Sequence, residues 1–459
     1  MNIKHITISL FFTMLLTKPC FVTAQNPTES MNPKEIKLLI DSLSNALNRW
    51  YIYPDKATLM VNNIKKNYKN GTYNKIKNKL ELAMQLHKDV QQAQQDGHLR
   101  IDYDPPFAKE LENPLSKAEQ KQEREAQLTM AHEGNFAFIK TEILSGNIGY
   151  VRWDGFMEFV EEAKPTVDAA FKFVSNCKAL IIDMRYNGGG SPDMVLYTQS
   201  YFFEQKTRMN DIINGNNDTL KGWTEPTITN FKLNMPVYIL TDKRTFSGAE
   251  DFTYGLQQAK RAVVVGDTTG GGAHPTGPCS IGQGFVLTIP TQRSFNIVTK
   301  TDWEGTGVRP NVAVPAEQAL TKAQALVLNS LLLKVKDGKE RDELQWNLTS
   351  IENKAQLTKQ IETDSIKIAK ETLLKYSGDY IPLDHNPHLQ PLFIIVKGDC
   401  LFRHSIMFGD IRLVPITNKK FIYNDETGRT IEFVLDNKGE ASTITLSRQD
   451  GIFTLTKKK

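Results

Sequence analysis

The chain has 459 residues, which is too long for one average domain and enough for two or three. Hydrophobic residues make up 40% of it and charged residues 24%, as is ordinary for a folded soluble protein. The formal net charge is only +4, so the charge balance gives no case for nucleic acid as a partner.

Residues 1–24 have the pattern of a secretory signal peptide. Lys4 and His5 precede an apolar stretch from Ile6 to Leu16, and Val22-Thr23-Ala24 offers a small-residue cleavage site. The apolar stretch is too short for a permanent membrane anchor, and we expect no transmembrane span in the mature chain. The sequence therefore predicts export, to the periplasm or the medium, after cleavage near Ala24.

Cys20 raises the alternative of a lipoprotein. Lys18 and Pro19 stand before it, where small residues are expected, and this disfavours lipidation. Cleavage would leave three widely spaced cysteines, which are Cys177, Cys279 and Cys400. Their spacing predicts no disulfide framework and no metal site, but one disulfide between two of them is an alternative.

Residues 25–105 are predicted to form an N-terminal helical domain. Asn32-Pro33-Lys34-Glu35 combines an N-cap, a proline in the first turn and a glutamate at the third position. Apolar residues then recur at helical spacing from Ile36 to Trp50, and further helices are expected near 56–69 and 73–93. Residues 106–145, which begin beside a Pro-Pro pair and become charged, are predicted to be a linker with some helix.

Residues 146–335 alternate strand-like and helix-like stretches, which predicts an α/β core with a largely parallel sheet. Ligands of such sheets tend to bind at the carboxyl ends of the strands. The expected strands are 148–153, 179–184, 237–241 and 262–265, with a hairpin-like pair at 285–289 and 295–299, and the expected helices include 158–174 and 319–334.

The C-terminal part changes character. Residues 336–371 are charged and weakly patterned, and we predict a linker helix there. Residues 372–459 contain short alternating runs separated by Gly, Asn and Asp turns, which predicts a small all-β domain.

Ser247 is the strongest candidate for chemistry. It follows the expected strand 237–241 and a short polar loop, and it precedes a helix-like stretch. Its hydroxyl is therefore expected at a helix N-terminus, where unpaired N–H groups favour negative charge. A serine nucleophile with an oxyanion site needs this geometry. A simple N-cap is the alternative, and the two roles are compatible.

Other segments offer weaker candidates. Gly188-Gly189-Gly190 follows a strand and can supply backbone N–H groups to an oxyanion, or form only a tight loop. His98 is a candidate base, metal ligand or polar turn residue, and His274 is a candidate base or an exposed loop residue. Glu304 can orient a histidine or lie in a solvated turn. No metal cluster or nucleotide-binding motif appears in the sequence, so we predict no cofactor.

Taken together, these segments resemble the tail-specific (C-terminal processing) serine protease family. They are most similar to the branch that contains the interphotoreceptor retinoid-binding protein repeats and the tricorn protease core. They come in family order within residues 30–335 and are specific as a set. The resemblance implies a ClpP/crotonase-like α/β core and a peptide or protein substrate. The matching segments are Asp96–His98, Leu180–Gly190, Thr245–Phe252, Val265–Pro275 and Trp303–Val308.

The resemblance also implies residue roles. Ser247 matches the nucleophile, His98 the histidine base of the tricorn-like branch, and Glu304 the carboxylate that orients this base. The processing branch uses a lysine base, but Gly272 stands at that position, so a Ser/Lys dyad is not available. His274 is kept as the alternative base. The matches to the oxyanion donors are Gly188, Gly189 and Gly248.

The resemblance is incomplete at one position, because Gly97 stands where the tricorn-like branch has a serine. The sequence thus predicts an exported serine-type peptidase with a Ser/His/Glu arrangement. The alternative is a non-catalytic binding protein for apolar ligands or peptides on the same fold, as in the retinoid-binding members. The joint presence of serine, histidine and glutamate favours the peptidase.

Overall fold

The computed structural model describes residues 31–458 except 77, 346, 349–350, 352–365, 383–388, 406–408, 416, 425–428, 438 and 449–450. The predicted signal peptide and part of the predicted linker helix at 336–371 lie outside the described residues. Contacts divide the chain into two compact units, which meet between Ala313 and Val314. None of the helices formed by the described residues has both the length and the apolar character that crossing a membrane requires.

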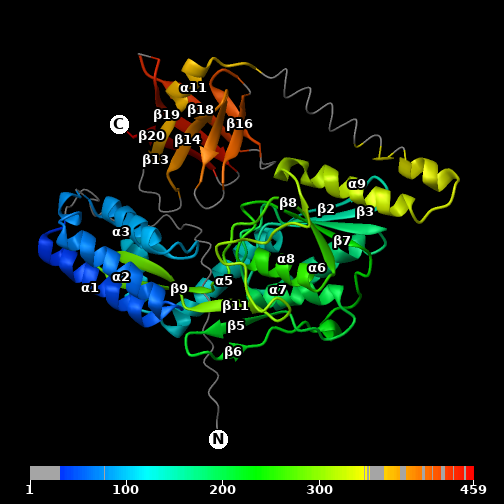
Figure 1. The fold of residues 1–459 in the computed structure, drawn as a ribbon, viewed down its shortest axis with the longest axis horizontal. Helices are drawn as coiled ribbons and strands as arrows, with labels where there is room; N and C mark the ends of the chain where they lie inside the picture. Colours follow the sequence, from blue (N-terminus) through cyan, green and yellow to red (C-terminus); the bar gives the residue numbers. More distant parts are fainter. Residues whose placement is uncertain are drawn as a thin grey trace, which may run out of the picture. The chain divides into compact units, whose positions relative to one another are not determined.

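Three helices open the first unit (Figure 1). The first begins as predicted: the Asn32 side chain accepts hydrogen bonds from the N–H groups of Lys34 and Glu35, and the Glu35 carboxylate accepts one from the N–H of Asn32. A 3₁₀ turn precedes the third helix, where one continuous helix was predicted. The elements are α1 (Pro33–Trp50), α2 (Pro54–Lys69), η1 (Tyr73–Lys75) and α3 (Lys79–Ala93).

A small antiparallel sheet shares its core with these helices. Its strand order is β1 (Arg100–Tyr103), β10 (Phe285–Pro290) and β9 (Thr276–Gly282). Apolar side chains from α1, α2 and α3 form one buried cluster with Phe285 and Leu287 of β10. The N-terminal helical region therefore folds against a segment almost two hundred residues further along the chain.

The predicted hairpin-like pairing of 285–289 with 295–299 is wrong. Strand β10 already has a partner on each edge, β1 and β9, so it has no edge left for another strand. The next strand, β11 (Gln292–Asn296), pairs instead with β5 (Asn210–Asn214), and β6 (Thr219–Leu220) completes that sheet.

A six-stranded mixed sheet forms the α/β core. All neighbouring strands pair in parallel except β2 and β3, which are antiparallel, so the prediction of a largely parallel sheet is confirmed. Its central strands β4 and β7 are buried at every position, which explains why all their residues except the last one are hydrophobic. The strand order is β12 (Val312–Ala313), β8 (Ala262–Gly266), β7 (Val237–Thr241), β4 (Ala179–Asp183), β3 (Ile148–Trp153) and β2 (Phe138–Leu144).

Helices cover this sheet and connect its strands. Those that follow β3, β4 and β7 lie together beside it (Figure 1). The segment predicted as a linker with some helix contains two helices and the edge strand β2. The helical elements of this part are α4 (Pro105–Glu112), α5 (Lys117–Glu133), η2 (Asn135–Ala137), α6 (Val160–Val174), α7 (Pro192–Gln199), η3 (Ser200–Phe202), η4 (Pro226–Ile228) and α8 (Gly248–Gln258).

The second unit contains a closed antiparallel barrel, which confirms the predicted all-β domain. Each strand pairs with the next one, and the first pairs with the last. Buried aromatic rings fill the barrel; those of Tyr376 and Phe433 stack with centroids 4.5 Å apart. The elements are η5 (Ala316–Gln318), α9 (Ala319–Leu332), α11 (Lys370–Tyr376), β13 (Gly378–Pro382), β14 (Leu392–Lys397), β15 (Cys400–His404), β16 (Ile411–Pro415), β17 (Lys420–Tyr423), β18 (Thr430–Leu435), β19 (Ala441–Arg448) and β20 (Gly451–Lys457).

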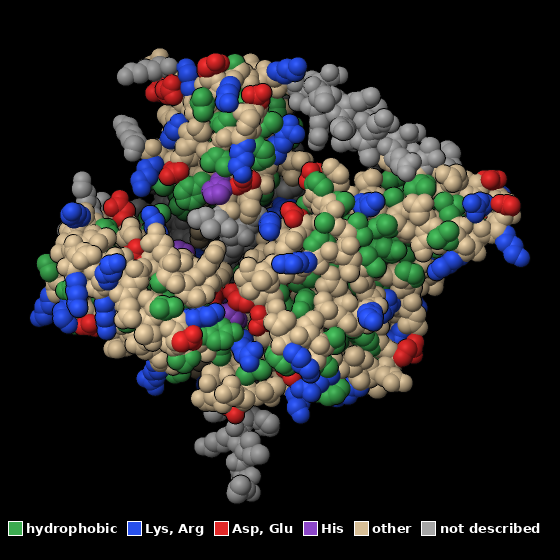
Figure 2. Space-filling model, viewed as in Figure 1, with side chains coloured by type: hydrophobic (Ala, Val, Ile, Leu, Met, Phe, Trp, Pro, Cys, Tyr) green, Lys and Arg blue, Asp and Glu red, His purple; other side chains and the backbone are tan. Residues whose placement is uncertain are grey.

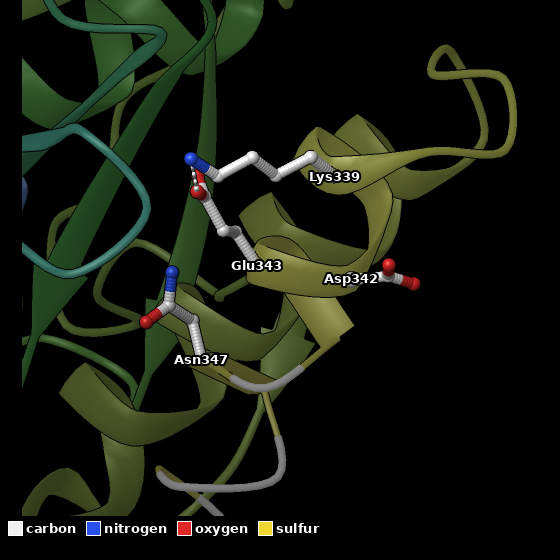
Figure 3. A pocket seen from close by; sticks show the side chains of 4 residues that line it. All are labelled: Lys339, Asp342, Glu343 and Asn347. Atoms are coloured by element: carbon white, nitrogen blue, oxygen red, sulfur yellow. Dashed lines mark ion pairs between the residues drawn. The ribbon is translucent and has the colours of Figure 1, made fainter.

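The described surface carries charges of both signs and, in the second unit, a hollow. Lysine and arginine side chains are interspersed with acidic ones on the face in Figure 2, as the small net charge would suggest. A hollow of about 570 Å³ in the second unit is lined by Lys339, Asp342, Glu343 and Asn347, and Lys339 pairs with Glu343 at 3.9 Å (Figure 3). These side chains include no nucleophile or histidine of the kind that peptide hydrolysis needs.

Candidate active site

Ser247 stands at the turn between β7 and α8, as predicted for a serine at a helix N-terminus. Its backbone has φ +53° and ψ −122°, a conformation that residues other than glycine rarely adopt. It is the N-cap of α8, so the first N–H groups of the helix lie beside it. Strain of this kind persists where the surrounding structure imposes it, and it gathers at functional sites.

The glycine loop after β4 packs directly against Ser247. Gly189 has φ +100°, and a Cβ atom there would lie 2.8 Å from the Cβ of Ser247 and 2.7 Å from the backbone nitrogen of Gly248. Distances this short leave no room for a side chain. The approach of this loop to the serine therefore requires glycine at position 189.

Asn187 holds the glycine loop in place. Its Nδ2 donates to the last carbonyl of β3 at 2.9 Å, its Oδ1 accepts the N–H of Gly189 at 2.8 Å, and its own carbonyl accepts the N–H of Phe246 at 3.2 Å. The N–H of Gly189, one of three predicted oxyanion donors, is thus engaged within the loop. The N–H groups of Gly188 and Gly248 make no hydrogen bond with any described residue.

Two similar ion pairs anchor the loops at the carboxyl ends of β4 and β7. Asp183 pairs with Arg185 at 2.6 Å, and Asp242 pairs with Arg244 at 2.5 Å. The Arg244 guanidinium also lies 4.5 Å from the centroid of the Tyr186 ring. The loops that carry the glycines and Ser247 are therefore fixed by charge pairs at neighbouring strand ends, of which the Asp183–Arg185 pair is fully buried.

His98 lies between Phe246 and Gly272. Its ring centroid is 4.4 Å from that of Phe246, and a Cβ on Gly272 would lie 2.5 Å from its Cε1. Both ring nitrogens are buried and have no hydrogen-bond partner. Burial lowers the pKa of His98 to about 4, against the opposing charge of Asp96, so the ring is neutral at pH 7.

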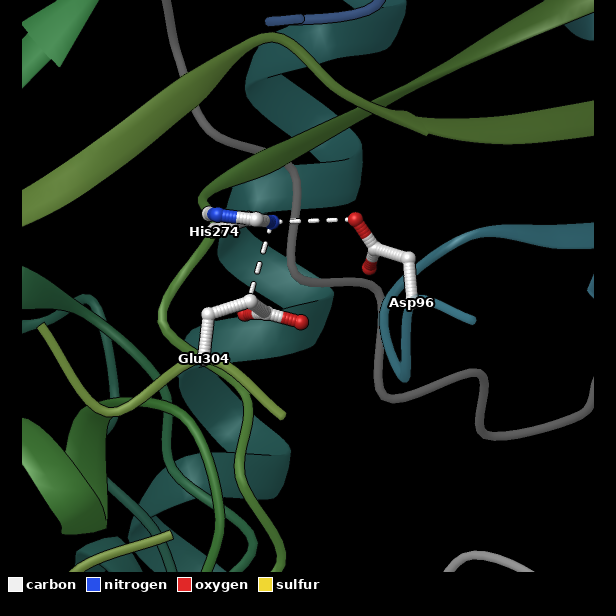
Figure 4. Close-up of side chains that lie close together, drawn as sticks. All are labelled: Asp96, His274 and Glu304. Atoms are coloured by element: carbon white, nitrogen blue, oxygen red, sulfur yellow. Dashed lines mark hydrogen bonds and ion pairs between the residues drawn. The ribbon is translucent and has the colours of Figure 1, made fainter. Parts of the chain in front are cut away.

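His274 lies between two carboxylates (Figure 4). Its Nδ1 is 2.9 Å from Asp96 Oδ2 and 3.3 Å from Glu304 Oε2, and its Nε2 is 3.4 Å from the hydroxyl of Tyr53. Burial alone would lower the pKa of His274, but the hydrogen bond to Asp96 and the charge of Glu304 outweigh it and raise the pKa above its ordinary value. Both nitrogens of this ring have partners.

No hydrogen bond joins Glu304 to His98 in this structure, although the predicted triad pairs them. Its Oε2 accepts the N–H of Ala273 at 2.6 Å, and this bond holds the carboxylate beside His274, the next residue. Its Oε1 is buried and has no partner. Burial and the neighbouring Asp96 raise the pKa of Glu304 to about 7, although His274 lowers it.

Asp96 belongs to the site, although no role was predicted for it from the sequence. Its carboxylate accepts the hydroxyl of Tyr51 at 2.8 Å, the backbone N–H of His98 at 3.0 Å and the Nδ1–H of His274 at 2.9 Å. The only sequence signal was its place two residues before His98. Asp96 links the two histidine segments, which lie far apart in the chain.

The cluster of Asp96, His274 and Glu304 has the donor types of a divalent-cation site, with ligand atoms within 4.8 Å of one another. Nδ1 of His274 is hydrogen-bonded to Asp96 at 2.9 Å and lies 3.3 Å from Glu304, within ion-pair distance when the ring is protonated. The absence of a metal or cofactor stays a prediction.

With this geometry established, comparison with known proteins identifies the family. Residues 147–314 match the model of peptidase family S41, and residues 33–141 match the N-terminal domain that accompanies S41 peptidase domains in eukaryotic interphotoreceptor retinoid-binding protein. The chain belongs to peptidase family S41. The resemblance seen in the sequence is thereby confirmed, and the chain is a serine peptidase by family.

Matches among solved structures include the following three, each with a TM-score below 0.5. The photosystem II D1 C-terminal processing protease shares 14% identity over 62% of this chain and 94% of its own, with a TM-score of 0.41. A Parabacteroides merdae protein described as a peptidase shares 20% sequence identity over 64% of this chain and 96% of its own, with a TM-score of 0.45. The tricorn protease shares 13% sequence identity over 70% of this chain and 37% of its own, with a TM-score of 0.39.

Proposed function

We propose that this S41 peptidase is exported and cleaves peptide bonds with Ser247 as its nucleophile. The observation that carries the proposal is the strained backbone of Ser247 at the start of α8, with the glycine loop packed against it. The serine attacks the scissile carbonyl, a histidine takes its proton and passes it to the leaving amine, and water then hydrolyses the acyl-enzyme.

His98 is the proposed base. A base needs a free nitrogen lone pair, and both nitrogens of His98 lack a partner, whereas those of His274 are engaged by Asp96 and Tyr53. The His98 ring also packs against Phe246, the residue before the nucleophile. It lies in the space that a side chain at position 272, the lysine position of the processing branch, would enter.

Glu304 is proposed as the carboxylate that stabilises the charged base. Its Oε1 and the nitrogens of His98 are buried polar atoms without partners, and such atoms are rare in folded proteins. A hydrogen bond between them would satisfy both groups. Catalytic hydrogen bonds often form only in the substrate complex, so this pairing requires Glu304 to turn from His274 toward His98 when substrate binds.

The oxyanion is proposed to form beside the start of α8. The N–H groups of Gly248 and Gly188 have no acceptor among the described residues, which suits donors that await a developing charge. Gly189, the third predicted donor, can contribute its N–H only by releasing Asn187. We therefore assign Gly189 mainly to the close approach between loop and serine.

The second candidate function is a binding protein that has lost turnover. One observation favours it: no hydrogen bond joins the Ser247 hydroxyl to His98 or His274 in the described structure. In that case apolar ligands or peptides would bind without being cleaved. The two functions differ in whether Ser247 is chemically activated.

Labelling by a fluorophosphonate probe tests the choice. We expect the native protein to be labelled, digestion and mass spectrometry to place the adduct on Ser247, and Ser247→Ala to abolish labelling, because only an activated serine attacks such a probe. Cleavage of a peptide library should be lost with it. A folded native protein that takes up no probe and cleaves no peptide would favour the binding function.

A further inference from the structure

Glu250 lies in the first turn of α8, three residues after Ser247, and is completely buried. Its Oε2 accepts the N–H of Ser247 at 3.0 Å and the N–H of Gly272 at 2.7 Å. Its Oε1 accepts the N–H of Gly271 at 2.7 Å and the hydroxyl of Thr269. One carboxyl group thus receives four hydrogen bonds, from the nucleophile and from a glycine segment about twenty residues further along the chain.

That glycine segment in turn holds the loop that carries Glu304. The carbonyl of Gly271 accepts the N–H of Gly305 at 2.9 Å, and the carbonyl of Gly272 accepts the indole N–H of Trp303 at 2.9 Å. The Thr269 hydroxyl accepts the N–H of Val308 at 2.6 Å. Glu250 is therefore the common anchor of the serine turn, the glycine segment and the segment 303–308.

The same segment forms the wall beside the proposed base. A Cβ on Gly272 would lie 2.5 Å from Cε1 of His98, so the backbone there is packed against the imidazole. A shift of this backbone would move the histidine relative to the serine. The peptide groups that Glu250 holds are therefore the ones that fix the spacing between nucleophile and base.

We propose that Glu250 is a positioning residue for catalysis, which sets the geometry of Ser247 and His98 through its hydrogen bonds to the serine turn and the glycine segment. The proposal rests on the function proposed above and deepens it. All four hydrogen bonds of the Glu250 carboxyl group go to backbone N–H groups and the Thr269 hydroxyl, so its effect is expected in the rate of the chemical step and not in substrate binding.

A carboxyl group suits this role in either protonation state. Burial raises the pKa of Glu250 to about 8, although the hydrogen bonds from Thr269, Gly272, Gly271 and Ser247 oppose the shift. A proton on Oε1 can be donated to the Thr269 hydroxyl, and the oxygens still accept the three N–H groups. An amide cannot do so, because its nitrogen has no free lone pair and would face at least one N–H donor.

Glu250→Gln is therefore the sharpest test, with Asp251→Asn as the matched control. Asp251 is the next residue of α8 and is partly buried, and it accepts its hydrogen bond from Asn210, away from the glycine segment. Both variants change a carboxyl group in the first turn of the same helix to an amide. Thr269→Val is a milder change. It removes the Thr269 hydroxyl, which donates a hydrogen bond to Glu250 and accepts one from the N–H of Val308.

We expect Glu250→Gln to lower kcat for peptide cleavage by about 100-fold with KM changed less than about threefold, and to slow fluorophosphonate labelling in parallel. Asp251→Asn should keep kcat within about threefold, and both variants should show similar falls in Tm. Glu250→Gln with near-native kcat, or losses of kcat that follow Tm equally in both variants, would overturn the proposal.

Failure of the Glu250→Gln variant to fold and failure of the proposed function itself can each be distinguished from failure of the proposal. If Glu250→Gln does not fold, Thr269→Val carries the test: a fall in kcat of about tenfold at unchanged KM supports the proposal, and an unchanged kcat contradicts it. Native protein that neither cleaves peptides nor takes up the probe would remove the proposed function itself. An active native enzyme with an active Glu250→Gln variant would remove only the role of Glu250.

Discussion

His98→Ala is expected to lower kcat/KM for peptide cleavage by about 10⁴-fold, because loss of a general base costs up to about this factor. The variant is also expected to fold. The imidazole nitrogens make no hydrogen bond, so their removal leaves no partner unpaired. Steady-state kinetics on a cleaved peptide, with Tm measured on the same sample, checks both parts of this expectation.

His274→Ala provides the contrasting variant. It removes the group between Asp96 and Glu304 and leaves two buried carboxylates facing each other, so we expect a clear loss of stability. Activity of the fraction that remains folded should fall much less than in His98→Ala. Full activity of His98→Ala, together with loss of activity in His274→Ala, would transfer the role of base to His274.

The pH profile separates the two histidines without a mutation. The base must be neutral to accept the serine proton, so kcat/KM falls as pH drops through the pKa of the base in the free enzyme. With His98 as base, the acid limb should lie near pH 4, where burial places its pKa. With His274 it should lie above pH 6.5, because Asp96 and Glu304 raise that pKa. Protonation of Glu304, whose pKa is raised to about 7, should add only a partial fall near neutral pH, because its ionised form assists the base and does not replace it. A complete loss of activity below pH 6.5, with no plateau down to pH 4, would contradict our assignment.

The strands of the core could be predicted from the sequence with little error. Ile148–Trp153 and Val237–Thr241 have the predicted bounds, because buried parallel strands are uninterrupted apolar runs between polar loops. The pairing of the strands could not be predicted in the same way. The partners of Phe285–Pro290 are 276–282 and 100–103, and nothing local in the sequence distinguishes these from the neighbouring 292–296. Closure of the C-terminal barrel depends in the same way on contacts between its first and last strands.

The candidate site could be predicted as residue types but not as contacts. Ser247 and the glycine loop follow buried strands, and local pattern suffices to place them. The partners of Glu304 depend on how the loop 303–308 meets the glycine segment, which spacing does not encode. Glu250 looks in the sequence like an acidic residue in a first helical turn. Only the fold brings the N–H groups of Gly271 and Gly272 to it.

Gly189→Ala is expected to lower kcat by about 10² to 10³-fold, the loss typical when one oxyanion donor is misplaced. The new Cβ would meet the Cβ of Ser247 at 2.8 Å and the nitrogen of Gly248 at 2.7 Å, and the φ of +100° is strained for alanine. The loop must therefore withdraw from the serine. Fluorophosphonate labelling should slow with kcat, because both reactions use the same oxyanion site.

Gly188→Ala is the matched control for this change. A Cβ at position 188 meets no atom within 4 Å, and the substitution keeps the backbone N–H that we propose as a donor. Its kcat should stay within about threefold of the native value, since neither the loop nor the donor has to move. Equal losses in the two variants would mean that the loop tolerates no alanine at all. Near-native activity of Gly189→Ala would mean that its close approach to Ser247 is not needed for catalysis.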